Sequence, residues 1–110
     1  MYVRIAKFVG GDMDEIEAEA ALLRDGIAAF RRGQASRELP PRLTEVSSRM
    51  EMLVDRHRGE VIVNVYCLTR DEMREADAIL RTMSPDNKGW GHRVSADIYE
   101  VALDEVTGRS

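Results

Sequence analysis

The residues best suited to chemistry lie toward the C-terminus, in the glycine-flanked stretch Asp86–His92. It holds the single tryptophan, Trp90, and one of two histidines, His92. An indole stacks on flat ligands, and an imidazole accepts and donates protons near neutral pH. One interpretation of the stretch is therefore a lid in which Trp90 binds a ligand and His92 is a catalytic acid or base. The structural alternative is that Trp90 plugs one end of the core.

A second group of candidate residues interrupts the stretch Gly59–Thr69, where Asn64 and Tyr66 alternate with valines and Cys67 follows. Asn64 and Tyr66 are either a catalytic pair or structural residues that hydrogen-bond inside an interface. Cys67 has no basic neighbour in the sequence that would activate its thiol. It is therefore predicted to be a small buried hydrophobic residue and not a nucleophile.

Other kinds of site are not indicated. Two histidines at unrelated positions and one cysteine form no metal-binding set, so no metal is expected. The sequence has no phosphate-binding loop, nucleophile elbow or paired-carboxylate motif, and no cofactor is expected. An acidic cluster after Asp12 suits a metal less well than a solvated helix start, because acidic side chains complement the helix dipole there.

A strand must hold the second group, because Gly59–Thr69 is the only long β-branched run. Side chains alternate along a strand, so two sets face opposite ways. One set is Val61, Val63, Val65 and Cys67, and the other is Ile62, Asn64, Tyr66 and Leu68. Both sets are largely apolar, as in a strand that is covered on two sides. A small domain rarely covers both faces of its sheet, so we expect a second copy to cover one.

Periodicity and capping residues predict the other elements. Asp12 with Glu15, and Thr69 with Glu72, have the spacing of capping boxes that begin helices. In order, the predicted elements are a strand over Tyr2–Val9, a helix from Asp12 to Gly33, a connector over Gln34–Leu43, a strand over Val46–Asp55, a hairpin into Gly59–Thr69, a helix from Thr69 to Met83, and a strand over Val94–Leu103. The second strand has an alternative, because Thr44–Leu53 is also compatible with a turn or two of helix.

This order predicts an α+β, ferredoxin-like split βαβ fold (βαββαβ). Right-handed crossovers place both helices on one face of a four-stranded antiparallel sheet, and the bare faces of two copies would pair into a dimeric barrel. We expect a single domain over residues 1–104 and a C-terminal tail over 105–110.

Composition limits the partners. The hydrophobic share of 44% and charged share of 33% are typical of a soluble globular protein. A net charge of −4 and an aromatic share of 5% argue against nucleic acid, including an RNA-binding ferredoxin-like domain, and against an anionic membrane. A single cysteine suits the reducing cytoplasm, and neither a signal peptide nor a membrane span is visible.

Three local features resemble the dimeric α/β-barrel superfamily that includes the antibiotic-biosynthesis monooxygenases. They are the strand that runs into Gly10-Gly11-Asp12, the turn Leu53–Arg56, and the passage from strand to capped helix at Tyr66–Glu72. The resemblance extends from Tyr2 to about Leu103. It implies a homodimer, and it implies a ligand between the sheet and the helices, beside Val63, Val65 and Cys67.

Members of this superfamily include cofactor-free oxygenases of polyphenols and quinols, haem-degrading enzymes, and isomerases of small ring compounds. The haem-degrading members use an Asn from the first strand, a His from the second helix and a Trp at the end of the third strand. Here Tyr2–Val9 contains no Asn, Asp71–Met83 contains no His, and Cys67 stands where the Trp would be. These departures argue against haem degradation.

Two functions remain open from the sequence. One is a cofactor-independent oxygenase, or a similar enzyme, that acts on a small aromatic substrate. The alternative is a non-catalytic homodimeric module for ligand binding or stress response. A pocket between the sheet and the helices, with His92 or arginine side chains at its mouth, would favour the first.

Overall fold

A computed structural model describes residues 1–34, 39–83 and 89–108 of the protein. Its centre is a four-stranded sheet made of β1 (Tyr2–Gly10), β2 (Arg49–Asp55), β3 (Glu60–Cys67) and β4 (Gly91–Glu100). The strand order is β2-β3-β1-β4, and all neighbouring strands are antiparallel. This is the arrangement of the ferredoxin-like fold, so the predicted fold class is confirmed.

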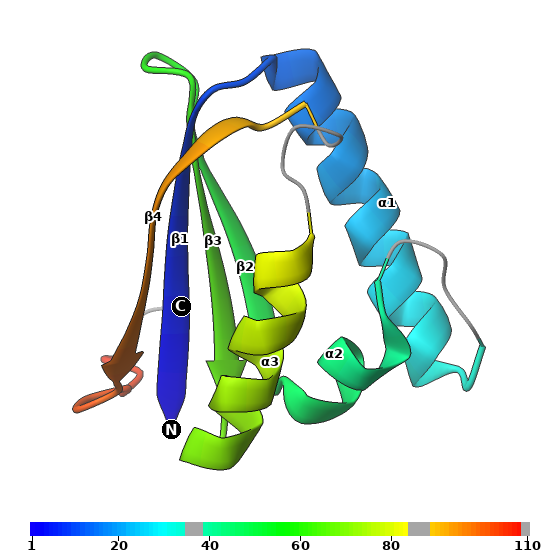
Figure 1. Cartoon of the computed structure of the whole chain (residues 1–110), viewed down its shortest axis with the longest axis vertical. Coiled ribbons are helices and arrows are strands. Elements are labelled where there is room, and N and C mark those ends of the chain that lie inside the picture. Colours follow the sequence, from blue (N-terminus) through cyan, green and yellow to red (C-terminus); the bar gives the residue numbers. More distant parts are fainter. Residues whose placement is uncertain (35–38, 84–88, 109–110) are drawn as a thin grey trace.

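The helices α1 (Met13–Arg31), α2 (Pro41–Val46) and α3 (Arg70–Thr82) all lie on one side of the sheet (Figure 1). Both predicted N-caps are present, because Asp12 accepts a hydrogen bond from the Glu15 amide and Thr69 from that of Glu72. None of the described helices is long and apolar enough to cross a membrane.

The prediction for residues 40–55 was partly wrong, because the helix α2 precedes the second strand. Pro41 occupies the first turn of this helix, where its missing amide hydrogen costs nothing. The turn buries Leu43 and Val46 completely or almost completely against the core. The strand then begins at Arg49 and not at Val46.

The last strand also begins earlier than predicted, at Gly91 instead of Val94, and it ends at Glu100 instead of Leu103. Gly91 pairs with Gly10, and His92 pairs with Val9. A register shift between Lys7 and Phe8 accommodates the extra residue. His92 therefore lies in a strand and not in a loop before it.

The core lies between the sheet and the helices. Val61, Val65 and Cys67 are buried there, as the alternation along the strand predicted. We call the opposite side of the sheet the outer face. By strand register and alternation it carries Arg49, Glu51 and Leu53 of β2, Ile62, Asn64 and Tyr66 of β3, Ile5 and Lys7 of β1, and Asp97 and Tyr99 of β4.

Candidate ligand-binding site

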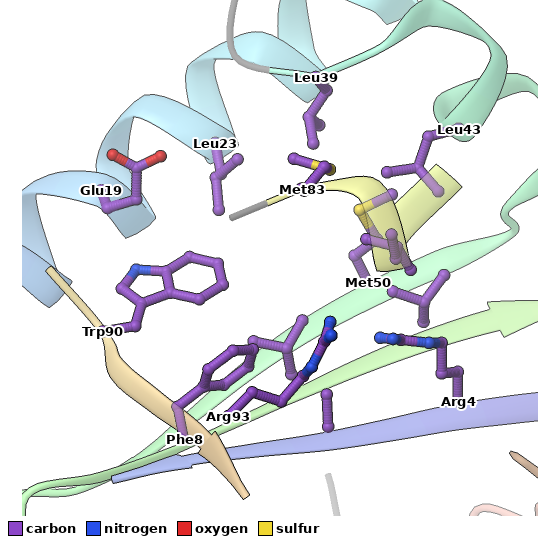
Figure 2. A pocket seen from close by; sticks show the side chains of 14 residues that line it. Arg4, Phe8, Glu19, Leu23, Leu39, Leu43, Met50, Met83, Trp90 and Arg93 are labelled. Atoms are coloured by element: carbon purple, nitrogen blue, oxygen red, sulfur yellow. The ribbon is translucent and has the colours of Figure 1, made fainter. Parts of the chain in front are cut away.

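A cavity of about 70 Å³ opens between the sheet and the helices. One water needs roughly 10–15 Å³, so the space is larger than a single water site. Its apolar walls are Ala6, Phe8, Leu23, Leu39, Leu43, Met50, Val63, Val65, Leu80 and Met83, and its other lining residues are Arg4, Glu19, Trp90 and Arg93 (Figure 2). The cavity thus lies on the side of the sheet where the resemblance implied a ligand.

Glycine-to-backbone contacts fix the position of Trp90. The amide of Asp12 donates to the carbonyl of Gly89 at 3.1 Å, which ties the start of α1 to the residue before the tryptophan. A Cβ on Gly11 would lie 2.6 Å from the carbonyl carbon of Trp90, closer than atoms tolerate. Gly91 has φ of +82°, a conformation that glycine adopts without strain. The close approach of these segments therefore requires glycine.

The indole of Trp90 forms one wall of the cavity. It meets the ring of Phe8 edge to face, with the centroids 5.1 Å apart and an angle of 74° between the planes. Its Nε1 is buried and has no hydrogen-bond partner within residues 1–34, 39–83 and 89–108, and in Figure 2 this nitrogen lies on the side of α1 and Glu19. Trp90 both fills core space and lines a cavity. Of the predicted lid Asp86–His92, residues 86–88 lie outside the described part of the chain.

Arg4 is the most deeply buried charged group of the cavity, with only 3% of its surface exposed. Its Nε donates to Asp77 of α3 at 2.8 Å, and the other carboxylate oxygen of Asp77 accepts from Arg81 at 2.8 Å. Burial alone would raise the pKa of Asp77, but the hydrogen bonds from Arg81 and Arg4 hold that pKa below its usual range. One terminal nitrogen of Arg4 is buried and has no hydrogen-bond partner in the described part of the chain.

Arg93 and Glu19 complete the polar lining. Arg93 is half-buried and stands opposite Phe8 in the strand register. Its side chain forms no ion pair or hydrogen bond within the described part of the chain. Figure 2 shows the guanidinium groups of Arg93 and Arg4 turned toward each other, and it shows the carboxylate of Glu19 turned away from both. One end of the cavity therefore carries two cations, and Glu19 and Trp90 line the other.

Three of the four predicted ligand-binding residues, Trp90, Val63 and Val65, line this cavity. Cys67 does not line it, and its buried side chain belongs to the same core cluster as Met73 and Ala76 of α3. Burial raises the pKa of the Cys67 thiol to about 11, so the thiol stays neutral at physiological pH.

The residues predicted to be catalytic lie elsewhere. Asn64 and Tyr66 are on the outer face, where both donate to the same oxygen of Glu51, at 3.2 and 2.8 Å. The hydrogen bonds from Tyr66 and Asn64 lower the pKa of Glu51, and the bond to Glu51 raises the pKa of Tyr66. His92 is exposed on β4. None of the three lines the cavity, although arginine side chains do.

The sequence interpretation missed Arg4, Glu19 and Arg93 as site residues. Two of them left a detectable signal. Arg4 is a charged residue on the same strand face as Ala6 and Phe8, and this face points inward. Glu19 lies three residues after Ile16 and four before Leu23, inside the apolar stripe of its helix. Arg93 left no such signal, because the start of its strand was misplaced.

No group of three or more His, Cys, Asp and Glu side chains in the described residues could hold a metal ion. The described part of the cavity contains neither histidine nor cysteine. What it offers is an apolar volume bounded by an aromatic ring, two cations, a buried N–H and one carboxylate. Such an arrangement suits a small organic molecule better than a metal.

The sequence matches no protein-family profile and no curated protein. Among solved structures it is similar to one described as "Crystal structure of antibiotic biosynthesis monooxygenase". The two chains are 15% identical, the match covers 96% of this chain and 99% of that chain, and the TM-score is 0.48. The fold assignment rests on the strand order.

Proposed function

We propose that the protein binds a small, flat, mainly apolar molecule between its sheet and its helices. The observation that supports this is the cavity of about 70 Å³, which is walled by Trp90, Phe8 and aliphatic side chains. Removing apolar ligand surface from water supplies affinity, and the indole face adds a preference for a planar ring. The few polar groups then select among molecules of this shape.

Titration of the intrinsic fluorescence tests this proposal, because Trp90 is the only tryptophan. We expect small phenols and quinols to change the emission in a saturable way. Val63→Phe should abolish the response, because the larger ring fills the cavity. The matched control is Val94→Phe at a position that is 54% exposed, and it should leave the response intact. A flat titration of the wild-type protein with every ring compound contradicts the proposal.

A second candidate function is the oxidation of the bound ring by O₂ without a cofactor. The observation that favours it is that Trp90 and Glu19 both line the cavity, with the indole nitrogen on the side of Glu19 (Figure 2). A donor and an acceptor together suit a hydroxyl group. Glu19 would accept the phenolic proton, and the N–H would stabilise the resulting anion, which is the form that transfers electrons to O₂. A phenol and O₂ would then give a quinone and water.

Oxygen uptake separates this enzyme from a non-catalytic binding module. Glu19→Gln should retain binding and slow uptake by ~10²–10⁴-fold, as expected for the loss of a positioned base. Glu17→Gln, which removes an exposed carboxylate of the same helix, is the matched control. Saturable binding with no uptake for any phenol would leave the binding function and reject the oxygenase.

We also propose that two copies pair through their outer faces to form a homodimer. This face exposes Leu53 and Tyr99 by half or more, and it holds a buried oxygen of Asn64 that has no hydrogen-bond partner in the described part of the chain. A second copy would cover the apolar groups and bring donors near that oxygen. Sedimentation velocity at micromolar concentration should show a dimer, with an interface above the ~1,000 Å² that is typical of specific contacts. A monomer under these conditions contradicts the proposal.

A further inference from the structure

We infer that the ligand of the cavity carries a carboxylate, bound between Arg4 and Arg93. This inference rests on the proposed binding function and specifies its ligand class. It begins with Arg4, which is 3% exposed and has one buried nitrogen without a hydrogen-bond partner among the described residues. A buried donor that lacks an acceptor is costly, so such groups are rare in folded proteins. The unpartnered nitrogen of Arg4 is therefore a donor that an acceptor on a ligand would satisfy.

The charges around Arg4 require that acceptor to be an anion. Asp77 is the carboxylate that contacts Arg4, and it is already shared with Arg81. Arg93 adds a further cation that lines the same cavity and has no ion pair among the described residues. Its guanidinium group and that of Arg4 point toward each other (Figure 2). Like charges that face one another beside apolar walls repel, and an anion between them removes the repulsion.

The shape of the site favours a carboxylate over other anions. A guanidinium group presents its N–H donors in a planar fork that matches the two oxygens of a carboxylate. The adjoining walls, including Val63, Val65 and Met50, are apolar. The apolar walls also favour an anion with a single charge over a dianionic phosphoryl group, because removing the higher charge from water costs more. The ligand class is thus a small aromatic carboxylic acid, with its acid group near Arg4 and its ring toward Trp90.

The test compares benzoate with benzamide, which has nearly the same shape and no charge. We expect benzoate to bind more tightly by roughly tenfold or more, followed by Trp90 fluorescence and calorimetry. Arg93→Gln should remove this preference while benzamide still binds, and Arg93→Lys should restore part of it. Arg24→Gln is the matched control, because it removes the same charge from an exposed position on α1.

The outcomes distinguish the inference from the function on which it rests. Equal affinity of the wild-type protein for benzoate and benzamide would overturn the carboxylate and leave the binding function intact. A preference that persists in Arg93→Gln would overturn the assignment to Arg4 and Arg93. Phenyl phosphate binding more tightly than benzoate would overturn the choice of anion. If no ring compound binds, both the function and the inference fail.

Discussion

The two faces of the sheet differ in how far their polar side chains are hydrogen-bonded to one another. On the outer face, Glu51 accepts hydrogen bonds from Asn64, Tyr66 and Arg49, so the polar groups largely satisfy one another. On the inner side, a nitrogen of Arg4 and the N–H of Trp90 have no hydrogen-bond partners among the residues that the structure describes. A satisfied network stabilises a surface, whereas donors left open in an apolar cavity are available to a ligand. The comparison explains why the candidate site lies among the helices.

The largest test of this comparison places the same charge on each face. Val61 is fully buried on the inner side, and Val61→Asp should abolish cooperative thermal unfolding. An unpaired buried charge costs several kcal/mol, which is comparable with the whole stability of a small domain. The neighbouring change Ile62→Asp, on the outer face, should leave a folded protein and dissociate the dimer. Circular dichroism and sedimentation measure the two effects. A cooperative transition in Val61→Asp would mean that the faces are assigned wrongly.

A smaller effect is expected where the backbone holds Trp90. Gly11→Ala forces apart the contact with the Trp90 carbonyl carbon, and it should lower the free energy of unfolding by ~1–3 kcal/mol. It should also weaken ring binding, because the indole moves. Gly33→Ala is the control. Gly33 has φ of +74° and open space around it, so this change should lower stability by conformational strain alone and leave binding unchanged. Denaturant unfolding and fluorescence titration measure both quantities.

The acid dependence of stability sharpens the comparison from the outer face. The folded state lowers the pKa of Glu51 from its ordinary 4.5, through the bonds from Tyr66 and Asn64. Ionised Glu51 therefore stabilises the fold above the unfolded pKa, and the contribution is lost as the pH falls through the folded pKa. Glu51→Gln should be less stable at pH 7 and should lose less stability between about pH 6 and 3. Thermal melts across this pH range measure the loss in both proteins. If Glu51→Gln loses as much stability as the wild-type protein, this role of Glu51 is contradicted.

The smallest expected effect is that of His92→Ala. The side chain is exposed on β4 and does not line the cavity. We expect a change within about 0.5 kcal/mol in stability, as for ordinary surface positions, with ring binding and oxygen uptake unchanged. A loss of oxygen uptake in this variant would indicate that His92 is the catalytic acid or base, as the sequence suggested, and would count against Glu19.

The sequence by itself determined the features that depend on neighbouring residues. The caps at Asp12 and Thr69 and the alternation along Gly59–Thr69 are local, because hydrogen bonds and side-chain directions follow from positions a few residues apart. The order of these elements then led to the ferredoxin-like fold. The alternation also marked Val63 and Val65 as sharing a face, whereas their place beside a ligand came from the family resemblance.

The tertiary structure alone decided the features that join distant segments. The short helix α2 is stabilised because Leu43 and Val46 are buried in the core. The start of β4 depends on the pairing of Gly91 with Gly10 of the neighbouring strand. The polar lining has the same origin, because Arg4, Glu19 and Arg93 come from a strand, a helix and another strand. No local pattern encodes the meeting of their side chains. That meeting depends on packing and strand register, which only the folded chain fixes.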